Sequence, residues 1–77
     1  MNDTDQRKIL IQQLKDAAAE LDLARQHFLV AAEHLEDNLI PRFGAHVLAA
    51  NGHLSKAEKL RDAISETHAA HSVPRAD

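Results

Sequence analysis

The segment Asn38-Leu39-Ile40-Pro41 decides the fold, because it is the one clear interruption in a 77-residue chain that is otherwise rich in helix-forming residues. Pro41 fits the first turn of a helix but not its interior, and it biases Ile40 toward extended geometry. The sequence therefore predicts two long helices joined by a turn at this segment. The predicted ranges are residues 4–38 and 41–70 for the helices, 1–70 for a single domain, and 71–77 for a disordered tail.

Apolar residues recur with a heptad period on both sides of the turn, which is typical of helices that pack along their whole length. Before the turn, positions a and d hold Leu14, Leu21, Phe28 and Leu35 (a) and Leu10, Ala17, Ala24 and Ala31 (d). After it, they hold Ile40, Val47 and Leu54 (a) and Phe43, Ala50, Ala57 and Ile64 (d). The sequence thus predicts an all-α protein, an antiparallel two-helix hairpin.

The two heptad patterns also predict which residues face each other. In an antiparallel pair, a positions of one helix oppose d positions of the other, and here the residue numbers of every such pair sum to 78. The predicted layers include Leu35 with Phe43, Ala31 with Val47, Phe28 with Ala50, Ala24 with Leu54, and Leu21 with Ala57. An alanine opposes a larger residue in most layers, and the larger one alternates between helices, as a dense core requires.

This alternation of alanine with large residues, from Leu10 to Ile64, resembles the core of the Rop family, four-helix dimers that bind plasmid RNA. The resemblance implies a dimeric four-helix bundle. The basic face that RNA binding requires is missing, since the net charge is −3 and the nine basic residues are scattered. We therefore expect no nucleic-acid partner.

An alternative reading breaks the second helix at Asn51-Gly52, a common turn pair, because Ser55-Lys56-Ala57-Glu58 matches a capping box. Gly52, Leu54 and Ala57 would then resemble the inter-helix turn and second helix of a tetratricopeptide repeat. The heptad period runs through this point without a shift, which favours a continuous helix.

The first helix carries more apolar residues than one seam needs. Leu29 falls at b, and Leu23 and Val30 fall at c, with Leu60 of the second helix nearby. We expect Leu23, Leu29, Val30 and Leu60 to form an interface with a second copy, giving a four-helix bundle, or with a larger protein. The simpler alternative is that these are scattered surface residues.

Four of the six histidines occupy g positions, and g faces g across an antiparallel pair. The register predicts His34 opposite His46 and His27 opposite His53, in two rungs about 10 Å apart. Paired imidazoles could bind a transition metal or, between two hairpins, haem. They could instead loosen an interface on gaining a proton, or simply border it without special chemistry.

The sequence contains few of the residues that other kinds of functional site require. The chain has no cysteine, which excludes disulfides and thiolate sites and suggests a reducing, cytoplasmic location. It has two glycines and so no glycine-rich phosphate loop, no apolar run long enough for a membrane span, and no visible serine or carboxylate catalytic set. The sequence predicts a non-enzymatic interaction or oligomerisation module without a cofactor, such as an accessory subunit, with a metal- or haem-binding bundle as the alternative.

Overall fold

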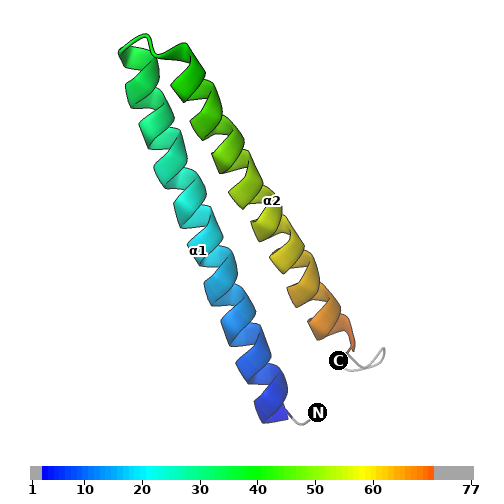
Figure 1. Ribbon diagram of the computed structural model, residues 1–77. Helices are drawn as coiled ribbons and strands as arrows, with labels where there is room; N and C mark the ends of the chain where they lie inside the picture. Colours follow the sequence, from blue (N-terminus) through cyan, green and yellow to red (C-terminus); the bar gives the residue numbers. More distant parts are fainter. Residues whose placement is uncertain (1–2, 71–77) are drawn as a thin grey trace.

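A computed structural model describes residues 3–70, which form two long antiparallel helices. Helix α1 spans Asp3–Glu36 and helix α2 spans Ile40–Ala70, and the two lie side by side along their length (Figure 1). Residues 3–70 contain no strand, so the predicted all-α hairpin is confirmed. The predicted tail, 71–77, lies outside the described residues.

Two expectations about the helix bounds change. Helix α1 ends at Glu36 rather than at 38, and α2 begins at Ile40 rather than at 41. The alternative break at Asn51-Gly52 is wrong, because α2 continues through both residues. A glycine inside a helix costs only about 1 kcal/mol, which packing along the rest of α2 can offset.

The turn is closed by a pair of backbone hydrogen bonds around Asn38. The Leu39 N–H donates to the His34 carbonyl at 2.8 Å, and the Asn38 N–H donates to the Leu35 carbonyl at 3.1 Å. With Asn38 in the left-handed region (φ 63°), this is a Schellman motif, which explains why α1 stops at Glu36. The Leu39 carbonyl then accepts the Phe43 N–H at 3.0 Å and opens α2.

Four alanines form the buried seam between the helices: Ala24 and Ala31 of α1, and Ala50 and Ala57 of α2. They are the small members of four consecutive predicted layers, which agrees with the predicted register. Their short side chains allow the two backbones to approach closely.

The large members of these layers are less covered than a dense core would require. Val47 and Leu54 of α2 are half-buried, but Leu21 and Phe28 of α1 remain exposed. No large hydrophobic side chain within residues 3–70 is buried. The expectation of a dense hairpin core is therefore wrong for α1, because a single partner helix covers only one side of a long side chain.

The left-handed conformation of Asn38 predicts a sharp dependence on residue type. Asn38→Val should lower the free energy of unfolding by about 1–2 kcal/mol, since a side chain branched at Cβ is strained at positive φ, whereas Asn38→Gly should be neutral or stabilising. Urea denaturation followed by helicity measures both. Asn51→Val, the same change at an exposed helical position, is the control, and an equal loss there would contradict the role of the turn.

The alanine seam predicts that added volume is costly at one face only. Ala50 is 0% exposed, so Ala50→Leu should force the helices apart and cost about 1–3 kcal/mol. Ala45→Leu makes the same change on the exposed side of α2 and should cost little. Thermal melting of the two variants compares them, and equal melting temperatures would show that the seam lies elsewhere.

Candidate functional site

A row of partly buried polar side chains runs along one flank of the alanine seam. It consists of Glu20, His27 and His34 from α1 and His46 and His53 from α2, and we call it the histidine row. The side chains alternate between the helices in the order Glu20, His53, His27, His46, His34.

Each neighbour in the row contacts the next. His53 Nδ1 lies 2.6 Å from Glu20 Oε2, and the His53 and His27 rings stack with centroids 5.4 Å apart. His27 Nδ1 lies 3.0 Å from His46 Nδ1, and the His46 and His34 rings are 5.1 Å apart. The row therefore links α1 to α2 over several helical turns.

Both predicted rungs, His34 with His46 and His27 with His53, are found as ring contacts. The heptad register did not predict the diagonal hydrogen bond between His27 and His46 or the pairing of Glu20 with His53. Glu20 occupies the g position seven residues before His27, which was the available signal. The diagonal contacts depend on side-chain rotamers, which heptad positions do not specify.

The arrangement of the four imidazoles is linear rather than convergent. Within residues 3–70, no group of three or more histidine, aspartate or glutamate side chains is placed to hold one metal ion. Metal or haem binding by His27, His34, His46 and His53 stays a prediction, and it would need ligands from outside the hairpin.

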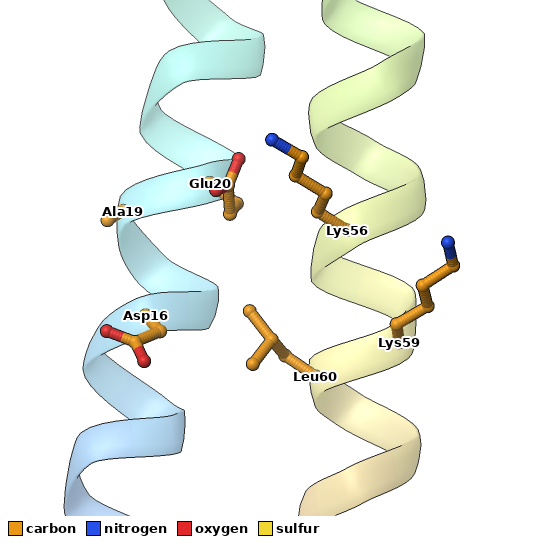
Figure 2. A pocket seen from close by; sticks show the side chains of 6 residues that line it. All are labelled: Asp16, Ala19, Glu20, Lys56, Lys59 and Leu60. Atoms are coloured by element: carbon orange, nitrogen blue, oxygen red, sulfur yellow. The ribbon is translucent and has the colours of Figure 1, made fainter.

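A shallow hollow lies beside the Glu20 end of the row (Figure 2). Leu60 extends from α2 into the space between the helices, and Lys56 extends toward Glu20, while the Asp16 carboxylate points away from α2. The lining residues are Asp16, Ala19, Glu20, Lys56, Lys59 and Leu60. Lys56 of α2 thus extends toward one acidic side chain of α1, that of Glu20, which favours the pairing of the two helices.

The four predicted interface residues do not form one surface. Leu23 and Val30, at c, and Leu60, at g, belong to the flank that carries the histidine row, and Val30 and Leu60 are half-buried. Leu29, at b, belongs to the other flank and is exposed. These residues therefore make a weaker candidate interface than the sequence suggested.

A stronger candidate is a line of exposed apolar residues at the a and e positions of α1, which we call the apolar stripe. Its large members are 44–56% exposed. The stripe consists of Ile11, Leu14, Ala18, Leu21, Phe28, Ala32 and Leu35, with Arg25 as its one charged member. Positions e and g flank opposite sides of a helix seam, so the apolar stripe and the histidine row lie on opposite flanks of the hairpin.

Comparison with known proteins adds no relative: no family model, curated protein or solved structure matches the chain. Of the two described helices, neither has a stretch apolar and long enough to span a bilayer.

The pairing of Glu20 with His53 predicts a measurable contribution to stability. Both side chains are about one-fifth exposed, so a hydrogen bond to the carboxylate is partly shielded from water. Glu20→Gln should lower the free energy of unfolding by about 1 kcal/mol at neutral pH. Glu33→Gln, at an exposed position of α1, should have almost no effect in the same denaturation experiment. Indistinguishable variants would show that the contact adds nothing.

Proposed function

We propose that this chain is a non-enzymatic oligomerisation module in which two hairpins join through their apolar stripes to form a four-helix bundle. The apolar stripe carries the proposal. Its members are spaced alternately by three and four residues, as in helices that pack against another helix, yet α2 leaves them about half exposed.

The size and shape of the hairpin show that it exposes more surface than a compact monomer does. The 8.5-kDa chain exposes 5929 Å², whereas a compact monomer of that mass exposes about 4,700 Å². Its radius of gyration is 17.5 Å, against about 11.5 Å for a compact domain of the same length. Stable dimers cover about 800 Å² on each partner, and an elongated body measuring 57 × 20 × 17 Å has a broad face large enough for this.

The charges beside the stripe favour a second copy of this chain over an unrelated partner. At the b positions bordering the stripe, Lys8 and Lys15 lie toward the start of α1, and Asp22 and Glu36 lie further along it. When two α1 helices run antiparallel, the basic half of one therefore faces the acidic half of the other. Such self-complementarity is what a two-fold symmetric interface requires.

A two-fold arrangement also pairs the four large side chains at the a positions of the stripe. With Leu21 opposite Phe28 of the second copy, Leu14 falls opposite Leu35, and each pair occurs twice. Asp22 and Arg25, which form an exposed ion pair within α1 at 3.2 Å, then lie near the symmetry axis and can exchange partners between copies. Covering the exposed half of one large stripe residue contributes about 1 kcal/mol to the stability of the dimer.

The finer parts of the proposal follow from the sequence. We place the protein in the cytoplasm because it contains no cysteine, and we assign it an accessory or scaffolding role because the sequence shows no serine or carboxylate catalytic set. A larger protein docking on the same stripe is the competing outcome of the experiment below.

The test is the mass in solution, measured by light scattering during size-exclusion chromatography. The wild-type protein should have twice the 8.5-kDa chain mass at micromolar concentration. Phe28→Glu places a charge in the middle of the stripe and should give a monomer with a lower melting temperature. Leu48→Glu is the matched control, because Leu48 is 74% exposed on α2 and lies outside the stripe.

Two results would overturn self-association. One is a wild-type monomer that melts cooperatively at every concentration, which would leave the stripe to a different partner. The other is a Phe28→Glu protein that keeps the dimer mass, which would place the interface elsewhere.

A further inference from the structure

The hydrogen bond between His27 and His46 has a geometry that depends on one proton. The two Nδ1 atoms are 3.0 Å apart and the ring centroids are 5.2 Å apart. The centroid separation exceeds the nitrogen separation by 2.2 Å, which is about the sum of the distances from each ring centroid to its own Nδ1. The two Nδ1 atoms therefore lie almost on the line that joins the two ring centroids. A bond of this kind needs an N–H on one ring and a lone pair on the other.

A metal ion fits this pair poorly. Two imidazoles that share an ion direct their lone pairs at a third point between them, with the angle at the metal near tetrahedral for zinc. Nitrogens that face each other in line leave room for a hydrogen atom, not for an ion. The absence of a convergent third ligand within residues 3–70 agrees with this reading.

We infer that the His27–His46 pair is a proton-sensitive contact that holds α1 against α2 at neutral pH and releases it in acid. The pair tolerates one added proton, because the donor ring can be charged at Nε2 while its Nδ1–H still donates. A second proton must occupy the accepting Nδ1, so that two N–H groups face each other on two cationic rings. The contact cannot persist at 3.0 Å in that state.

The neighbours in the row strengthen this response. His53 stacks on His27, and His34 lies against His46, so each further charged ring adds a like charge about 5 Å away. Among the described residues, Glu20 is the one anion in the row, and it contacts His53.

Other charged groups at c positions border the same flank: Asp16 on α1, Asp37 in the turn that follows α1, and Arg42 and Lys56 on α2. They balance in sign, so they do not offset a row of four cations. The His53–Glu20 contact responds in the opposite sense, since a charged His53 binds the carboxylate more strongly. The net response of the row to added protons is a loss of stability, because the repulsion among the four rings outweighs the one contact with a carboxylate.

This inference does not depend on self-association, because both histidines belong to one hairpin and lie on the flank opposite the apolar stripe. Acid opening of the contact should therefore be independent of protein concentration, whereas dissociation of a dimer is not. Failure of the dimer proposal and failure of the proton-sensitive contact can thus be told apart.

The first experiment is thermal melting, followed by helicity at about pH 7.5 and about pH 5.0. The wild-type melting temperature should fall by at least about 5 °C in acid. His46→Gln should lose more than half of that difference, because an uncharged amide can either donate to or accept from His27. His34→Gln, which removes a ring contact but no nitrogen–nitrogen hydrogen bond, should keep most of it.

The second experiment reads the proton directly and does not depend on how well a variant folds. Imidazole ¹⁵N spectra of the wild-type protein at neutral pH should show Nδ1–H on His53 and on one of His27 and His46, and a free Nδ1 lone pair on the other. Acid should convert both His27 and His46 to the charged form together with the loss of helix–helix contacts.

Three results would overturn the proposal. The first is an equal acid shift in wild-type and His46→Gln proteins. The second is Nε2–H on both His27 and His46 at neutral pH, which leaves no donor at Nδ1. The third is a chelator that lowers the wild-type melting temperature at neutral pH but not that of His46→Gln, which would assign the pair to a metal ion.

Discussion

The close approach of α1 and α2 at the four buried alanines is the constraint on which the rest of the structure depends. Ala24, Ala31, Ala50 and Ala57 carry the smallest side chain that still favours a helix, so only short side chains separate the two backbones at the seam. That proximity lets side chains at the g positions reach across the seam. It also leaves Leu21 and Phe28, at the a positions of α1, exposed beside the seam.

As a result, the two flanks of the hairpin differ in their chemistry. On one flank, imidazoles and a carboxylate satisfy each other's hydrogen-bonding groups across the helices, with His27 bonded to His46 and His53 to Glu20. On the other flank, the stripe from Ile11 to Leu35 exposes apolar surface that no part of residues 3–70 covers. A polar flank whose imidazoles contact one another within the hairpin, and an apolar flank that α2 leaves about half exposed, support the proposed assembly into a larger helical bundle.

The energetic balance of such a molecule is delicate. A seam of alanines buries little apolar area, and short chains have little stability in reserve. Each contact between the helices therefore contributes a large part of the total stability of the hairpin. This gives a hydrogen bond between two histidines unusual influence, and it ties the presentation of the apolar stripe to the integrity of the hairpin that supports it.

The sequence by itself determined the helices, the turn and the axial register. Pro41 and the heptad period specify where the chain reverses, and the period also places His34 level with His46 and His27 level with His53. Each of these features depends on neighbouring residues or on a period along one helix. The order of residues along the chain is therefore enough to predict them. The exact last residue of α1 was misplaced because it depends on the left-handed Asn38.

Only the tertiary structure decided how each helix is rotated about its own axis. A heptad pattern places a and d together on one face, but the sizes of the side chains in the seam determine which of the two is buried. In α1 the alanines at d are buried, while Leu21 and Phe28 at a are not. The same rotation turns the g positions toward α2. The diagonal bond from His27 to His46 and the pairing of Glu20 with His53 then follow from side-chain rotamers in three dimensions, which no spacing along the chain records.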